Sequence, residues 1–320
     1  MERRRGGAGA ILRFEHVRPA RDAAFQPRRA HEITPQFLDS AIAALKRWKF
    51  DIVSMDEACR RAAAAALPRR FVALTFDGAT RDLKTHGCPV LAKHGVPFTV
   101  YVPTAFPDRL GEAWWLALEQ VIARNDRVAL VMEGREHRFE MPEPQQKVQL
   151  YDLLERWMRA LPPADLSAAI NDLCRRYRID LAALSREAFL DWDDLDKLAA
   201  DSSVTFGSMT VHAPVLTNLG DADASREIAM GRAVAQAAFH REVLHFAYPF
   251  GDRASFNSRH VALAKAAGFA SAVTTLPGTV KTEGRSDLHA LPRIAWDGRQ
   301  PSLAVLRALL SGMMVAKAGN

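Results

Sequence analysis

The sequence predicts an α/β fold in which a mostly parallel sheet curves into a barrel-like body that carries a mainly helical insertion. Strand and helix patterns alternate over residues 34–103, which is typical of a parallel sheet. The alternation stops between residues 107 and 201, where helical patterns dominate, and resumes from residue 203. A structureless loop of that length is uncommon in a compact domain, so the middle segment is expected to form helices packed on the main body.

Composition indicates a soluble globular protein. The chain has 320 residues, of which 48% are hydrophobic and 25% charged, and this suits one large α/β domain with an insertion. The net charge of +6 comes mostly from scattered Arg, which predicts no nucleic-acid groove and only a weak preference for anionic partners. The oligomeric state has no sequence signature.

Three features lead us to expect a cytoplasmic protein. The N-terminus has no apolar segment of the kind found in secretory signals. No apolar run approaches the roughly 18–20 residues of a membrane span. Cys59, Cys88 and Cys174 are odd in number and far apart, so they match no metal or redox spacing and are expected to be reduced thiols.

The elements follow in order. A helix over residues 34–48 has Thr34 as predicted N-cap and Pro35 as its first residue. We then expect strands at 50–55, 71–76 and 98–103, with helices at 57–66 and up to His94. The insertion predicts helices at 111–123, 145–160 and 164–177, and a hairpin turning at Glu133-Gly134. After it we expect strands at 203–206, 243–249 and 270–275, and helices at 223–239, at 258–267 and from residue 301.

These elements define the expected organisation of the chain. Residues 1–10 are expected to be a disordered terminus and residues 11–300 the barrel, with residues 107–201 as its insertion. Residues 301–320 are expected to form a C-terminal helix and tail. In barrel-like α/β folds the chemistry lies at the carboxyl ends of strands. Three predicted strand ends stand out: "LTFDGATRD" at 74–82, "VTFGSMTVHAPVL" at 204–216 and "FAYPFGD" at 246–252.

Together these stretches resemble the polysaccharide deacetylases of carbohydrate esterase family 4, which share the nodulation-protein-B (NodB) homology domain. The family motifs are Thr-Phe-Asp-Asp-Gly, His-Thr-x-x-His-Pro and Tyr-Pro-x-Gly, and "TFD" at 75–77 and "YPFG" at 248–251 match them. "AKAAGFASAVTT" at 264–275 is similar to the family's closing helix and strand. The resemblance implies a distorted (β/α)7-type barrel, and hydrolysis of N-acetyl groups on amino-sugar polymers or oligomers such as chitooligosaccharides.

The resemblance also implies roles for individual residues. Asp77 falls on the general base, and the backbone N–H of Phe250 falls on the donor to the tetrahedral oxyanion. The metal carboxylate falls on Gly78, and the two metal histidines fall on Met209 and Ala213. A carboxylate base alone contributes about 10²–10⁴-fold. A metal lowers the pKa of its bound water from about 15.7 to about 7, which is the larger effect. We therefore expect no metal cofactor and little or no metal-dependent deacetylation.

Other side chains could contribute to the site. His212, beside the second lost histidine, is the substitute metal ligand to consider, although such a site needs a full ligand set. Asp82 is expected to cap the following helix, with His86 one turn along it. His289 could correspond to the family's late general acid, although a strand-end role suits its surroundings better. Arg293 could orient Asp77 or bind a sugar, because the Arg that often precedes the family's Tyr-Pro is Ala247 here.

Further candidates are substrate contacts. Tyr248, Trp296 and Thr210 are the predicted substrate-binding residues. Trp114, Trp115 and Phe250 could likewise be sugar platforms or core residues.

Four hypotheses follow. The protein could be a deacetylase homologue that binds amino-sugar oligomers with little metal-dependent activity, or a non-catalytic carbohydrate-binding or regulatory scaffold. It could also be an enzyme with a new metal site around His212. Finally, the clustered differences could be deliberate substitutions of a natural site.

Overall fold

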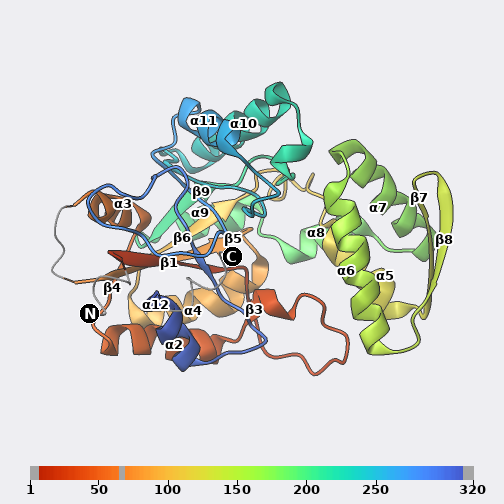
Figure 1. The fold of residues 1–320 in the computed structure, drawn as a ribbon, viewed down its shortest axis with the longest axis horizontal. Helices are drawn as coiled ribbons and strands as arrows, with labels where there is room; N and C mark the ends of the chain where they lie inside the picture. The colour runs from red at the N-terminus through yellow and green to blue at the C-terminus, as the bar shows by residue number, and fades with distance from the viewer. Residues whose placement is uncertain (1–6, 65–68, 313–320) are drawn as a thin grey trace.

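The main body of the protein is a parallel sheet wound into a barrel, with helices outside it and the insertion to one side (Figure 1). The computed structural model describes residues 7–64 and 69–312. Seven strands lie in the order β11-β10-β9-β6-β5-β1-β12, and a further strand, β4, pairs with β5. All of these pairings are parallel. The strands of this sheet are β1 (Gly9–Phe14), β4 (Asp51–Val53), β5 (Phe71–Asp77), β6 (Phe98–Val102), β9 (Val204–Ser208), β10 (His245–Ala247), β11 (Ser271–Val273) and β12 (Ile294–Ala295).

The segment before β12 closes the sheet on itself. Leu291 forms a parallel bridge with Val273 of β11, and three residues later Ile294 pairs with Leu12 of β1. The two ends of the strand order are therefore joined through residues 291–294. This confirms the predicted distorted (β/α)7-type barrel.

The first strand corrects the predicted disorder of residues 1–10. β1 begins at Gly9 and pairs with β5 over its full length. The N–H of Ala8 also donates to the carbonyl of Val280 (2.6 Å). The apolar side chains of Ala10, Ile11 and Leu12 are buried, so burial holds this end of the chain in the sheet. The part of the predicted terminus at residues 1–6 lies outside the described residues.

Helices cover the barrel on two sides. In Figure 1, α10 and α11 lie above the strands, and α2, α4 and α12 lie below them. Thr34 accepts from the N–H of Phe37 at the start of α2, as its sequence predicts. The helices of the body are α2 (Pro35–Arg47), α3 (Met55–Ala63), α4 (Cys88–His94), α9 (Trp192–Ala199), α10 (Asp221–Phe239), α11 (Ser258–Ala266) and α12 (Leu303–Leu310). A π-helical turn (Leu83–Gly87) precedes α4, and the short strands β2 (His16–Val17) and β3 (Glu32–Ile33) pair with each other.

The insertion has its own hydrophobic core. Leu118, Leu154 and Leu173 are fully buried in a cluster separate from the core of the barrel. The predicted hairpin turns at Glu133-Gly134, where both residues have positive φ. Its elements are α5 (Trp114–Arg124), β7 (Arg127–Met132), β8 (Arg135–Glu140), α6 (Pro144–Ala160), α7 (Pro163–Tyr177) and α8 (Leu181–Ala188).

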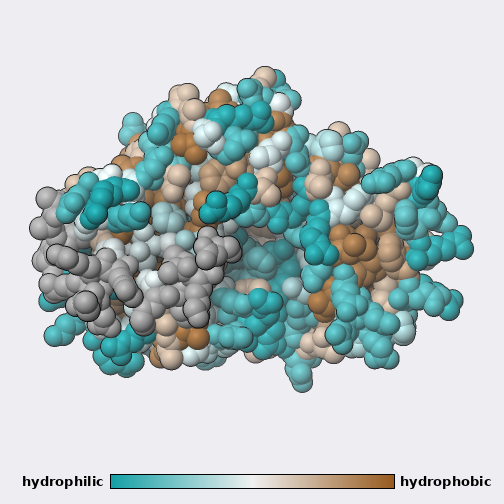
Figure 2. Space-filling view, viewed as in Figure 1, coloured by the Kyte–Doolittle hydropathy of each residue, from teal (hydrophilic) through white to brown (hydrophobic). Residues whose placement is uncertain are grey.

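Helix α6 attaches the insertion to the barrel. The guanidinium of Arg159 lies 4.3 Å from the ring centroid of Phe250 and pairs with Asp252 (2.6 Å). The Asn218 side-chain amide donates to the carbonyls of Arg159 (2.8 Å) and Leu161 (2.9 Å). The space-filling view is hollowed where the barrel meets the insertion (Figure 2). Across residues 7–64 and 69–312, no helix has both the length and the apolar character needed to cross a membrane.

The packing of α10 against the 209–213 turn gives a first prediction. A Cβ added at Gly231 would lie 2.5 Å from the backbone carbon of Thr210. Gly231→Ala should therefore displace the turn or the helix and lower the free energy of unfolding by about 1–3 kcal/mol, measured by urea denaturation. Met230→Ala changes the exposed neighbour in the same helix and should stay within about 0.5 kcal/mol of the parent. Equal effects of the two changes would contradict the close contact.

Candidate functional site

A cavity lies at the carboxyl ends of the strands, between the barrel and the insertion. The mapped base, Asp77, lines it together with the three mapped metal positions, Gly78, Met209 and Ala213. Phe250 lines it as well, from the loop after β10. Its insertion-side wall includes Trp114, Trp115 and Glu155, and further lining comes from Arg13, Glu15, His16, Arg28, Phe106 and Phe189.

Two guanidinium groups bind the carboxylate of Asp77. Arg293 donates in a bidentate manner, from Nη1 to Oδ1 (2.7 Å) and from Nη2 to Oδ2 (2.8 Å). Arg13 donates from Nε to Oδ2 (2.6 Å). The side chain of Asp77 is only 5% exposed and that of Arg293 is fully buried. Three of the roughly four acceptor positions of this carboxylate are therefore occupied by cations.

Arg293 is fixed inside the barrel by further contacts. Its Nε donates to the carbonyl of Thr274 (2.7 Å) and its Nη1 to the hydroxyl of Thr75 (3.2 Å). Its guanidinium carbon lies 5.6 Å from the ring centroid of Tyr101. This arrangement makes Arg293 the buried counterion that orients Asp77, and it leaves only about one acceptor position of the carboxylate open.

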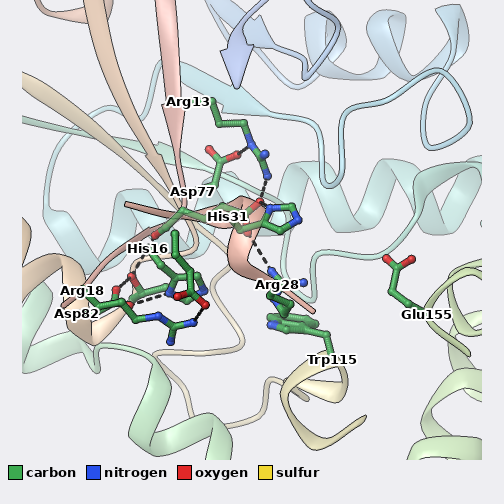
Figure 3. Close-up of polar contacts among 12 residues, drawn as sticks. Arg13, His16, Arg18, Arg28, His31, Asp77, Asp82, Trp115 and Glu155 are labelled. Atoms are coloured by element: carbon green, nitrogen blue, oxygen red, sulfur yellow. Dashed lines mark hydrogen bonds and ion pairs between the residues drawn. The ribbon is translucent and has the colours of Figure 1, made fainter. Parts of the chain in front are cut away.

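The polar network continues from Asp77 through Arg13 to Glu15. Figure 3 shows Arg13 and Asp77 in this network, with His31 and Arg28 below them. Glu15 also accepts from Arg28 Nη2 and His31 Nδ1, both at 2.9 Å. Burial opposes ionisation of Glu15, but Arg13, His31 and Arg28 outweigh it and hold the pKa of Glu15 well below its usual range. Arg13 thus lies between two carboxylates. Burial lowers the pKa of its guanidinium, but Glu15 and Asp77 outweigh burial and raise that pKa overall.

A second buried pair lies beside this network. His16 Nδ1 donates to Asp82 (2.8 Å), and the hydroxyl of Thr80 donates to the other Asp82 oxygen. The prediction that Asp82 caps the following helix is wrong, because its carboxylate makes no cap bond and binds His16 instead. Burial raises the pKa of Asp82, but the bonds from His16 and Thr80 more than offset it and lower the pKa overall. His86, on the π-helical turn, lies outside the cavity lining.

The residues present do not fit a divalent metal. Gly78 and Ala213 have no side-chain donor, and the thioether of Met209 is a soft, weak ligand for zinc. Asp77 is already paired with two cations. Within the two described ranges, no group of three His, Cys, Asp or Glu side chains is arranged to hold a metal ion.

His212, the predicted substitute ligand, lies away from the cavity. Its Nδ1 bonds to Glu227 Oε1 (2.7 Å), and its side chain is 59% exposed. The bond to Glu227 raises the pKa of His212. Thr210 is buried and accepts from the N–H of Ala213 (3.0 Å), so it shapes the 209–213 turn.

The other aromatic candidates divide between core and cavity. Tyr248 is buried, stacks on Phe256 and donates to the carbonyl of His289 (2.8 Å). Trp296 is also buried and stacks on Phe37, with ring centroids 4.5 Å apart. Both lie outside the lining of the cavity. His289 donates from Nε2 to the carbonyl of Phe269 (2.8 Å), which is a structural contact.

Phe250 has a left-handed backbone conformation in a largely buried turn at the cavity. Its φ is +60°, and its carbonyl accepts from the hydroxyl of Thr275 (2.7 Å). Its N–H makes no hydrogen bond to any residue in the described part of the chain. This N–H is therefore a free donor on a residue that lines the cavity.

Sequence reasoning missed Arg13, Glu15, His16 and Glu155. Arg13 lies in β1, and Glu15 and His16 come directly after this strand. The short apolar stretch Ala10–Leu12 is the signal that could have predicted the strand. Glu155 lies in α6, and burial raises its pKa. Only the packing of the insertion on the barrel brings Glu155 to the cavity, so no local pattern marks it.

The order of strands in the barrel gives the chain the fold of solved polysaccharide deacetylases. Solved structures with this fold include the Streptococcus pyogenes deacetylase PplD in complex with acetate (TM-score 0.60, 15% identity, covering 93% of this chain and 96% of that one). A de-N-acetylase from Aggregatibacter actinomycetemcomitans has a TM-score of 0.60 and 12% identity over 94% of this chain and 98% of its own. IcaB from Ammonifex degensii has a TM-score of 0.58 and 16% identity, covering 97% and 98%. No protein-family model and no curated protein matches the chain.

The buried pair of Asp77 and Arg293 gives a second prediction. Arg293→Met leaves a buried carboxylate with only Arg13 and should lower the free energy of unfolding by about 3–5 kcal/mol, measured by urea denaturation. The double variant Asp77→Leu/Arg293→Met removes both charges and should lose less than Arg293→Met alone. Additive losses would contradict the pairing. As a control, Arg299→Met breaks an exposed pair and should change stability by less than about 0.5 kcal/mol.

The low pKa of Glu15 gives a third prediction. A carboxyl whose pKa is lower in the folded protein than its ordinary value of 4.5 stabilises the folded state above pH 4.5. This stability is lost as the pH falls from 4.5 towards the lower, folded-state pKa. Between pH 6 and pH 3.5, the parent should therefore lose more stability than Glu15→Gln, measured by urea midpoints at each pH. Glu140→Gln, in an exposed pair, is the control and should follow the parent. Parallel curves for Glu15→Gln and the parent would contradict the proposed charge network.

Proposed function

We propose that this protein binds N-acetylated amino-sugar chains in the cavity and does not carry out metal-dependent deacetylation. The observation that carries the proposal is the state of Asp77, which is bound by two guanidiniums next to metal positions occupied by Gly78, Met209 and Ala213. The substrate class comes from the resemblance of the motifs and from solved neighbours described as polysaccharide deacetylases.

The lining of the cavity supports a sugar ligand. Sugars present apolar C–H faces to aromatic rings and hydroxyls to charged or amide groups. Trp115 and Phe250 provide aromatic surface, while Glu155 provides a carboxylate acceptor on the insertion side. The free N–H of Phe250 offers a donor to an acyl oxygen.

The same residues argue against efficient amide hydrolysis. A general base must accept a proton from a water within hydrogen-bond reach. Asp77 would have to activate that water while it neutralises Arg293 inside the barrel. Without a Lewis acid at the mapped positions, the amide carbonyl would also lack the polarisation that the family chemistry requires.

A fourth prediction tests this proposal. Isothermal titration with N-acetylated chitin oligomers should show binding, and de-N-acetylated oligomers of equal length should bind more weakly. Acetate release should stay at the buffer rate with added Zn²⁺, and dialysed protein should retain no stoichiometric metal. Trp115→Ala should weaken binding by about 1–3 kcal/mol, while Leu110→Ala at an exposed position outside the cavity should not.

Two results would overturn the proposal. Stoichiometric metal together with acetate release would establish a working deacetylase. Absence of binding to any amino-sugar oligomer would favour the alternative of a regulatory scaffold that does not bind carbohydrate.

A further inference from the structure

Arg13 lies in the cavity that contains the three positions at which the family resemblance implies metal ligands. It lines the same cavity as Gly78, Met209 and Ala213, and its Nε donates to Asp77 Oδ2 (2.6 Å). Figure 3 shows its guanidinium next to the carboxylate of Asp77. A permanent positive charge thus stands beside the mapped base, at a place where the family resemblance implies a metal cation.

The sheet register explains how Arg13 reaches this point. Arg13 of β1 pairs with Thr75 of β5, two residues before Asp77. Residues two apart in a strand share one face, so Thr75 and Asp77 face the same way, and Arg13 lies diagonally opposite Asp77. Its position is therefore set by strand pairing rather than by a mobile loop.

Side-chain contacts fix the guanidinium and leave one donor free. Nε binds Asp77 and Nη2 binds Glu15, which is itself held by Arg28 and His31. Nη1 has no hydrogen-bond partner anywhere in residues 7–64 and 69–312. The Arg13 side chain is 14% exposed and lines the cavity, as does Phe250 with its free N–H. The cavity thus has two unpaired donors and a built-in cation.

We propose that the Arg13 guanidinium takes the place of the metal and binds the acyl oxygen of the ligand, together with the N–H of Phe250. The ligand chemistry is an acetamide carbonyl or the carboxylate of free acetate, both of which accept hydrogen bonds from a guanidinium. The glycan part of this inference rests on the function proposed above, whereas recognition of acetate does not.

The proposal has a consequence for rebuilding the metal site. A divalent cation placed beside Asp77 would be repelled by the guanidinium of Arg13. Restoring the three ligands should therefore be insufficient while Arg13 remains. The backbone adds a separate obstacle, because Gly78 has a φ of +101°, which an aspartate rarely adopts, and Ala79 has a φ of +54°. Ala79→Gly should let this turn adjust when Asp is placed at position 78.

The first experiment measures metal affinity by Co²⁺ absorption titration. The rebuilt variant carries Gly78→Asp, Ala79→Gly, Met209→His and Ala213→His. Adding Arg13→Gln should tighten Co²⁺ binding by at least about 10-fold. The matched control adds Arg28→Gln, which removes another cavity cation that does not touch Asp77, and should give a smaller gain. Equal affinities with and without Arg13, or no Co²⁺ binding by the folded variant lacking Arg13, would overturn the proposal.

The second experiment uses the unaltered site and does not depend on folding of the rebuilt variants. Acetate and N-acetylglucosamine oligomers are titrated by NMR into the parent, Arg13→Gln and Arg18→Gln, the last being an arginine outside the cavity lining. Arg13→Gln should weaken both ligands by at least about 10-fold and Arg18→Gln neither. Unchanged acetate affinity in Arg13→Gln, or no acetate binding by the parent, would overturn the proposal. Acetate binding that depends on Arg13, without oligomer binding, would support the proposal while the proposed glycan function fails.

Discussion

The pairing of Asp77 with Arg293 is the interaction on which the rest of the structure depends. Asp77 ends β5, and Arg293 immediately precedes β12, the strand that pairs with β1 at the closure of the barrel. A buried charge without a partner is strongly destabilising, so each of the two side chains requires the other inside the barrel. The ion pair thus links the centre of the sheet to its closing segment.

The same pairing limits what the site can do. A carboxylate that neutralises a fully buried guanidinium is a structural counterion. The two hydrogen bonds from Arg293 fix the orientation of both Asp77 oxygens. Arg13 and Glu15 extend the arrangement towards the cavity, with alternating charges held by short contacts. Asp77, which the sequence resemblance maps onto a general base, is in this structure the counterion of a buried guanidinium.

Local patterns in the sequence predict where helices begin and where strands end. The long-range side-chain contacts of the site depend on tertiary packing and could not be predicted in this way. Thr34 and Pro35 predict the start of α2, and strand order predicts that Asp77, Gly78, Met209 and Ala213 lie together, as they do around the cavity. β1 was missed because its few apolar residues follow a terminus expected to be disordered. The contact of Asp82 with His16, and the burial of Tyr248 and Trp296, depend on partners far away in the sequence.

Helix α6 joins two parts of the cavity that belong to different regions of the chain. Glu155 lines the cavity and Arg159, one turn further on, holds Phe250 and Asp252 of the barrel loop. Because a helix is stiff over a single turn, these two contacts move together. A tilt of α6 would shift the insertion wall and the loop in the same motion. The helix therefore fixes the spacing between the Glu155 wall of the cavity and the loop that carries Phe250.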